Sequence, residues 1–139
     1  MKNIVVIDGQ GGGIGRQLVA KLRELLPDAR IAAVGTNCGA SNAMLKAGAS
    51  TAATGENAVL VACRRADVIA GPIGIVIADS LGGEITPAMA VAVAQSPAKR
   101  VLLPFNICDN IVVGVADYNV ARLVQSAVDE VVRSFAAES

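Results

Sequence analysis

The sequence predicts a three-layer α/β fold in which helices cover both faces of a mostly parallel sheet. Short apolar segments alternate with amphipathic segments of helical periodicity along the chain. Hydrophobic residues make up 53% of the chain and aromatic residues only 2%, so aliphatic side chains must build the core, as is typical of buried parallel strands. A glycine-rich turn also follows the first apolar segment directly. With 139 residues, the chain fits a single domain spanning residues 1–139.

The first part of the chain alternates strands with helices. The predicted strands are the apolar runs 2–7 and 31–34 and a short edge strand, 51–53. A helix over 13–26 is predicted from one apolar face, formed by Ile14, Leu18, Leu22 and Leu25. A shorter helix over 40–47, with Met44 and Leu45 inward, ends at Gly48. The next helix runs to Arg65, with Thr54 as its N-cap and Glu56 near its positive end.

The second part continues the alternation and ends on a long helix. Strands are predicted over 67–70, 100–105 and 111–115. The last of these is expected to be an antiparallel edge strand, because only a tight turn separates it from its predecessor. Residues 75–81 fit a helix or an extended segment, and the pattern favours a helix. Thr86-Pro87 opens a helix to Gln95. The closing helix covers 118–135, with an inward face of Val120, Leu123, Val124, Ala127, Val128, Val131 and Val132.

Composition excludes several functional classes. Twelve basic and twelve acidic residues cancel, and aromatic residues are scarce, so nucleic acid is not an expected partner. The absence of histidine excludes histidine-based catalysis, and no metal site is expected. The longest apolar run, 68–78, is too short to span a bilayer. Three cysteines without a CxxC motif argue against a disulfide framework, and the N-terminus has no secretory signal, so a cytoplasmic protein is expected.

Small and polar residues stand where four predicted strands end. In open parallel sheets, ligands bind outside the carboxyl ends of the strands at the point where the strand order reverses. These four segments are therefore expected to converge on one crevice. They are Asp8-Gly9, Gly35-Thr36-Asn37, Gly71-Pro72-Ile73-Gly74 and Asn106.

The glycine turn is predicted to hold a phosphate. Glycine allows positive φ and close approach of backbone amides to a ligand, and the following helix presents a positive dipole end. Gly11 to Gly15 would hold the phosphate, Thr36 and Asn37 the sugar or base, and Gly71 to Gly74 with Asn106 the far wall. The ligand would be NAD(P) or another nucleotide. The full candidate set is Asp8, Gly9, Gln10, Gly11, Gly12, Gly13, Ile14, Gly15, Gly35, Thr36, Asn37, Gly71, Pro72, Ile73, Gly74 and Asn106.

Two catalytic interpretations of this turn fail on specific residues. The spacing Gly9-x-x-x-Gly13-x-Gly15 resembles short-chain dehydrogenases, but their catalytic Tyr-x-x-x-Lys appears only as Tyr118-x-x-x-Arg122. The acidic residue that would hold a ribose at the end of the second strand is also missing. As a P-loop the turn is one residue too long and has Arg16 and Gln17 in place of lysine and a hydroxyl residue. A purely structural role, in which the glycines only permit close packing, stays open.

Other side chains have competing explanations. Asp8 would bind a ribose or a metal, or cap the turn's own amides, and the capping role is favoured. Asp8 and Cys108 are the candidate catalytic residues if the protein is an enzyme acting on a small anionic metabolite. Cys38 stands near a helix start, and Cys63 is expected in the core. Arg16 would either contact a phosphate or form a surface ion pair.

Five segments of the sequence are distinctive: residues 7–15 (IDGQGGGIG), 35–37 (GTN), 44–49 (MLKAGA), 54–58 (TGENA) and 71–75 (GPIGI). Through these segments, which span most of its length, the sequence resembles a family of short bacterial proteins known as a domain of unknown function. The resemblance implies no activity.

The chain is also expected to form a homo-oligomer, because its apolar segment 73–93 and closing helix exceed what one small core needs. An oligomeric structural or regulatory subunit is a third alternative for its function.

Overall fold

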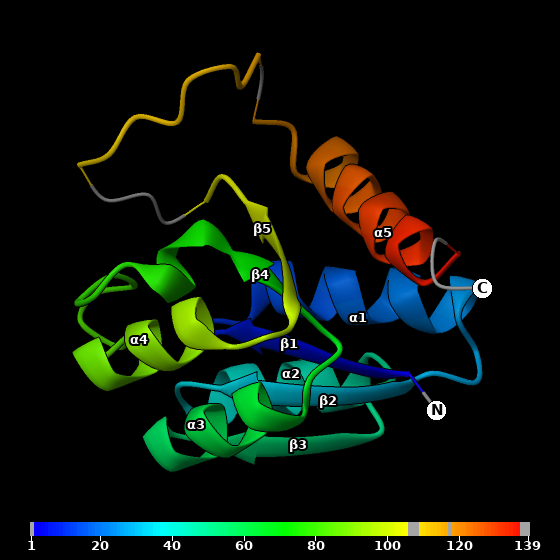
Figure 1. Cartoon of the computed structure of the whole chain (residues 1–139), viewed down its shortest axis with the longest axis horizontal. Helices are drawn as coiled ribbons and strands as arrows, with labels where there is room; N and C mark the ends of the chain where they lie inside the picture. The colour runs from blue at the N-terminus through cyan, green and yellow to red at the C-terminus, as the bar shows by residue number, and fades with distance from the viewer. Residues whose placement is uncertain (1, 106–108, 117, 137–139) are drawn as a thin grey trace.

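The computed structural model describes residues 2–105, 109–116 and 118–136 as a parallel sheet between two layers of helices (Figure 1). The sheet has five strands in the order β3-β2-β1-β4-β5, and every neighbouring pair is parallel. This is the strand order of Rossmann folds. The strands are β1 (Asn3–Asp8), β2 (Arg30–Gly35), β3 (Thr51–Thr54), β4 (Val68–Pro72) and β5 (Lys99–Leu103). The helices are α1 (Gly13–Leu25), α2 (Cys38–Lys46), α3 (Glu56–Arg65), η1 (Ile73–Val76, a 3₁₀ turn), α4 (Pro87–Gln95) and α5 (Val120–Ala136).

The central strand β1 divides the core into two halves. Ile4 and Val6 face one side and Val5 and Ile7 the other, and all four side chains are fully buried. The first pair packs into a cluster with α1, α2 and α5, and the second into a cluster with α3, η1 and α4. A strand buried on both faces must be apolar at every position, which explains the unbroken run in the sequence.

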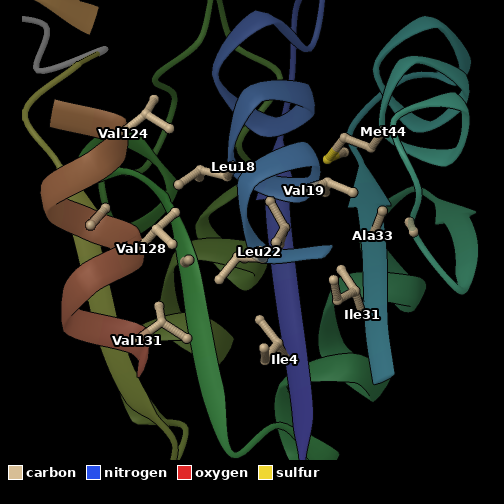
Figure 2. Packing of buried hydrophobic residues seen from close by; sticks show 14 of the residues in the cluster. Ile4, Leu18, Val19, Leu22, Ile31, Ala33, Met44, Val124, Val128 and Val131 are labelled. Carbon is tan, nitrogen blue, oxygen red and sulfur yellow. The ribbon is translucent and has the colours of Figure 1, made fainter. Parts of the chain in front are cut away.

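Helix α1 lies over the sheet between α2 and α5 (Figure 2). Leu18 and Leu22 are fully buried, and Figure 2 shows them between β1 and the valines of α5. Two leucines predicted to face inward, Leu25 and Leu45, are instead about half exposed because each lies beside the buried stripe of its helix. The buried face of α2 is formed by Ala40, Ser41 and Met44.

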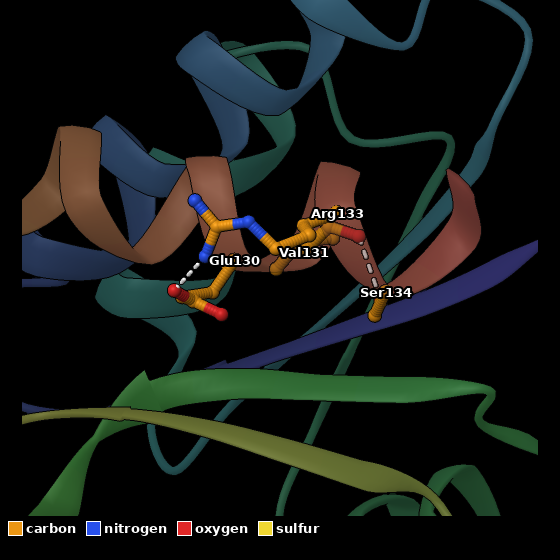
Figure 3. A network of polar contacts seen from close by, with 4 residues as sticks. All are labelled: Glu130, Val131, Arg133 and Ser134. Atoms are coloured by element: carbon orange, nitrogen blue, oxygen red, sulfur yellow. Dashed lines mark hydrogen bonds and ion pairs between the residues drawn. The ribbon is translucent and has the colours of Figure 1, made fainter. Parts of the chain in front are cut away.

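Helix α5 confirms the predicted closing helix. Its buried stripe consists of Val124, Ala127, Val128 and Val131, and the outer predicted positions are half buried. On the last turns, the Arg133 guanidinium donates to Glu130, and Ser134 Oγ donates to the Val131 carbonyl at 2.7 Å (Figure 3). These contacts satisfy polar groups on the outer side of a helix whose other side is apolar.

The predicted antiparallel edge strand over 111–115 is wrong. Residues 109–116 contain turns but no strand or helix, and β5 is the last strand at this edge of the sheet within the described residues (Figure 1). Ile111 and Val113 are 87% and 92% exposed, so these two side chains do not pack on the sheet. Gly114 also has a φ of 96°, which interrupts extended backbone. The run of apolar residues and the tight turn before it indicated an edge strand, but two of its side chains stay largely exposed.

Two other segments differ from prediction. Residues 75–81 are not a helix: η1 ends at Val76, and the chain then turns, with positive φ at Asp79 and Leu81. The N-cap of α3 is Gly55 rather than Thr54, whose hydroxyl instead lies 2.6 Å from Ser41 Oγ of α2. Within the described residues, none of the helices combines the length and apolar character needed to cross a bilayer.

The predicted start of α4 is confirmed and gives a stability prediction. Thr86 Oγ1 accepts a hydrogen bond from the Met89 amide at 3.1 Å and donates to Glu56 Oε2 at 2.6 Å. Thr86→Ala should therefore lower the free energy of unfolding by about 1 kcal/mol, measured by urea denaturation. Thr86→Ser keeps the hydroxyl and serves as the control. Equal losses in both variants would show that the hydroxyl does not contribute through capping.

Candidate functional site

The strand-end segments of β1, β2 and β4 meet at the carboxyl edge of the sheet. The strand order reverses between β1 and β4, where ligands bind in open parallel sheets. The end of β1 leads into the glycine turn, and the Thr36 amide donates to the Asp8 carbonyl at 3.0 Å, which joins the ends of β1 and β2. Two sequence candidates, Asn106 and Cys108, lie outside the described residues. The other predicted site residues all belong to this edge.

Three glycines of the turn are explained by packing. A Cβ on Gly9 would lie 2.5 Å from Thr36 Oγ1, and one on Gly15 would lie 2.6 Å from Met44 Sδ. Gly12 has a φ of 73°, and its Cβ would lie 2.9 Å from the Ala40 Cα. All three are buried. At these positions the structural interpretation of the motif holds.

The other two glycines of the turn have no such explanation. Gly11 and Gly13 are exposed, and a Cβ at either position would meet nothing within 4 Å. Neither has a positive φ. Among the described residues, no group accepts a hydrogen bond from the amide of Gly11 or Gly13. Two free N–H groups therefore stand at the positive end of α1 with open space beside them.

The Asp8 side chain caps backbone amides of the glycine turn. Its Oδ1 accepts from the Gly9 amide at 2.8 Å and its Oδ2 from the Gly15 amide at 2.7 Å. The side chain is only 3% exposed, and burial raises the pKa of Asp8 above its ordinary value, against the lowering effect of these amides. Both oxygens are thus held by the turn itself, which is the capping role favoured from the sequence.

Thr36 and Asn37, predicted to contact a sugar or base, are held by another part of the chain. Asn37 caps α2 through Oδ1, which accepts from the Ala40 amide at 2.9 Å. Its Nδ2 donates to the Gln10 carbonyl at 2.9 Å and to Glu84 Oε1 at 2.7 Å. Thr36 Oγ1 donates to the same Glu84 oxygen at 2.6 Å. A carboxylate from a loop far along the sequence therefore lies at the end of β2.

Glu84 is the site residue that sequence reasoning missed. It lies in residues 77–86, between η1 and α4, and also accepts from the Gln10 amide at 3.0 Å. These hydrogen bonds, with that of Thr36 the strongest influence, lower the pKa of Glu84 below its ordinary value of 4.5. No spacing rule links positions 36 and 84. The available signal was Gly82-Gly83 directly before an acidic residue, in a segment that follows a strand end.

A cationic groove lies beside the glycine turn. It runs between α1 and α2, and its volume is about 670 Å³. Arg16 is on the first turn of α1, next to the free amides, and Lys46 is on the last turn of α2. Neither forms an ion pair with any described residue. The lining residues are Arg16, Gln17, Ala20, Gly39, Asn42, Ala43, Lys46 and Ala47.

The remaining candidates lie away from the crevice or show no special chemistry. Cys63 is in the core, as predicted, and burial raises the pKa of its thiol to about 11. Cys38 is exposed at the start of α2. In the part of the chain that the structure describes, no three cysteine, aspartate or glutamate side chains are grouped to hold a metal ion. Gly71 of β4 is explained by packing, since its Cβ would lie 2.3 Å from the Ile7 carbonyl oxygen.

The lowered pKa of Glu84 gives a pH prediction. A carboxyl group whose pKa is lower in the folded state stabilises the fold above its unfolded pKa, and this contribution is lost as the pH falls through the folded pKa. The difference in unfolding free energy between wild type and Glu84→Gln should therefore be largest near neutral pH and shrink below about pH 4.5. Urea denaturation at a series of pH values measures it. A difference independent of pH would contradict the assignment of the shift to these hydrogen bonds.

Comparisons with known proteins identify the family. No curated protein matches the chain in sequence. A solved structure with some likeness is that of a dodecameric FMN-dependent Ubix-like decarboxylase from Escherichia coli O157:H7, with a TM-score of 0.49 and 18% identity over 98% of this chain and 94% of that chain. The fold assigned above rests on this chain's own strand order. The family model described as a domain of unknown function (DUF3842) matches residues 3–136, which confirms the resemblance seen in the sequence. The protein therefore belongs to the DUF3842 family.

Proposed function

We propose that the protein binds a small phosphate-bearing ligand, a nucleotide or dinucleotide, at the carboxyl ends of β1, β2 and β4. One observation carries the proposal: Gly11 and Gly13 have free amides, open surroundings and no positive φ. Within the described part of the chain, no contact or backbone angle requires glycine at either position. A ligand that approaches the backbone would require it, because a side chain there would stand between the ligand and the amides.

The same crevice offers contacts for the rest of such a ligand. Arg16 stands one turn along α1 from the free amides and would meet a second anionic group. Thr36 and Asn37 stand at the end of β2, where a sugar or base would lie, and Gly71 to Gly74 would form the far wall. NAD(P) and other nucleotides are the ligands that we propose. No observation on the described residues favours the enzyme alternative, since Asp8 is engaged by the turn.

A thermal-shift panel tests the proposal. The purified protein would be heated with inorganic phosphate, pyrophosphate, sugar phosphates, nucleoside mono-, di- and triphosphates, NAD and NADP. A ligand that binds only the folded state raises the melting temperature as it saturates the site. Matched unphosphorylated nucleosides and sugars serve as controls. A shift with phosphorylated ligands alone supports the proposal, and no shift with any of them contradicts it.

Homo-oligomerisation is a second proposal, carried by the exposed apolar segment 109–116. Ile111 and Val113 expose most of their surface to solvent, which is unusual for neighbouring large aliphatic side chains. Light scattering after size exclusion should find an oligomer, and a double variant with Ile111→Ser and Val113→Ser should shift the population toward smaller species. An unchanged mass in the double variant would remove this segment from the interface.

A further inference from the structure

We propose that Glu84 determines the specificity of this site by accepting a hydrogen bond from a ribose hydroxyl of a ribonucleotide. The inference rests on the proposed function and names a ligand class for it. In Rossmann folds, an acidic residue at the end of the second strand holds a ribose hydroxyl. Here β2 ends in Gly35-Thr36-Asn37, and Glu84 brings a carboxylate to that point from the loop before α4.

The hydrogen bonds leave one carboxylate oxygen available. Oε1 accepts from three donors: the Gln10 amide, Thr36 Oγ1 and Asn37 Nδ2. No described residue donates to Oε2, and that oxygen is not among the buried polar atoms. The carboxylate is therefore fixed by one oxygen, while the other keeps some contact with solvent and can accept a further hydrogen bond.

The position of Glu84 matches the proposed phosphate site. The Gln10 amide donates to the Glu84 carboxylate, and Gln10 directly precedes Gly11 in the chain. The carboxylate is therefore hydrogen-bonded to the residue next to the first free amide. A ribose hydroxyl at Oε2 and a phosphate at the amides of Gly11 and Gly13 are thus neighbouring contacts, as the two groups are in a nucleotide. The negative charge on Glu84 would also disfavour a ribose that carries a 2′-phosphate.

The loop that carries Glu84 is held in place by contacts with the core and by its own hydrogen bonds. Leu81 and Ile85 are buried in the same core cluster as Val5 and Ile7 of β1. The Asp79 amide donates to the Ile85 carbonyl at 2.7 Å, and Ser80 Oγ donates to the Gly74 carbonyl. Asp79 and Leu81 have φ values of 67° and 56°, an uncommon conformation for residues other than glycine. The packing and hydrogen bonds maintain this backbone, and they fix where the Glu84 side chain begins.

The variant Glu84→Gln removes the proposed ribose acceptor, Oε2, but keeps an oxygen for the hydrogen bonds within the protein. The amide oxygen of glutamine can still accept from the three donors at Oε1, but an NH₂ group replaces Oε2. Isothermal titration would compare wild type and Glu84→Gln with inorganic pyrophosphate, the four common ribonucleoside diphosphates, and their 2′-deoxy forms. Glu56→Gln, at the start of α3, is the control for loss of a surface charge.

We expect the wild type to prefer its tightest ribonucleotide over the 2′-deoxy form about tenfold. The preference should fall to about threefold or less in Glu84→Gln, while pyrophosphate binding persists in both proteins. An unchanged preference in Glu84→Gln would overturn the inference. So would tighter nucleotide binding by that variant without ribose preference, which would mean that the carboxylate occludes the site. Pyrophosphate binding without any gain from a ribose overturns this inference alone, whereas no binding of any of these ligands overturns the proposed function as well.

Discussion

Gly13→Val is expected to weaken binding of a phosphate-bearing ligand about a hundredfold without unfolding the protein. The isopropyl group would occupy the open space next to the free amides of Gly11 and Gly13 and exclude a phosphate. Hydrogen bonds from two amides to a charged group contribute together about 3 kcal/mol, which corresponds to about a hundredfold in affinity. Stability should change by less than about 1 kcal/mol, because a Cβ meets nothing and valine is a better helix former than glycine.

The matched control is Ala121→Val, which adds carbon atoms to an exposed position on the first turn of α5, outside the cationic groove. Titration calorimetry with the ligand selected by the thermal-shift panel would measure both variants, and urea denaturation would report their stability. We expect Ala121→Val to bind as the wild type does. Equal affinities for Gly13→Val and the wild type would show that the ligand does not approach the start of α1.

Gly71→Ala is expected to destabilise the fold by about 3 kcal/mol. Its Cβ would lie 2.3 Å from the Ile7 carbonyl oxygen, a backbone atom of β1 that no side-chain rotation can move. β1 and β4 are the central strands, each hydrogen-bonded on both sides, so neither can move away without disturbing a second pairing. The methyl group would therefore strain the middle of the sheet.

Urea denaturation measures this effect, with Gly11→Ala as the matched control. At Gly11 the same added methyl meets nothing within 4 Å, so we expect stability close to that of the wild type. A loss below about 1 kcal/mol in Gly71→Ala would show that the two strands separate more easily than their packing implies. Equal losses in both variants would show that the close approach to Ile7 is not the cause, because the same methyl group meets nothing at Gly11.

The sequence predicted the fold correctly where the apolar side chains that define an element are buried. The unbroken apolar run of β1 and the leucines Leu18 and Leu22 of α1 have one way to be buried, so periodicity alone predicted them. The predicted strand over 111–115 was wrong because an apolar run indicates a strand only where a neighbouring surface covers it, and Ile111 and Val113 are largely exposed. Whether such a surface exists depends on the tertiary structure.

The site was predicted in part for a similar reason. Asp8, the glycine turn and Thr36 were found because each follows a strand end in the chain, and parallel strands bring such ends together. Glu84 was missed because its contact with Thr36 spans 48 positions and depends on the path of an irregular loop. Nor could the sequence distinguish the glycines that packing requires, such as Gly12, from Gly13, which packing does not require.

The central claim is that a phosphate binds the free amides at the start of α1. The most direct measurement is a titration of ¹⁵N-labelled protein with pyrophosphate, and with the nucleotide selected by the panel, followed through the backbone amide signals. We predict that the Gly11 and Gly13 signals shift saturably with one common dissociation constant, and that the buried Gly15 amide, which donates to Asp8, shifts less. Saturable shifts elsewhere with Gly11 and Gly13 unmoved, or no saturable shift at all, would contradict the account.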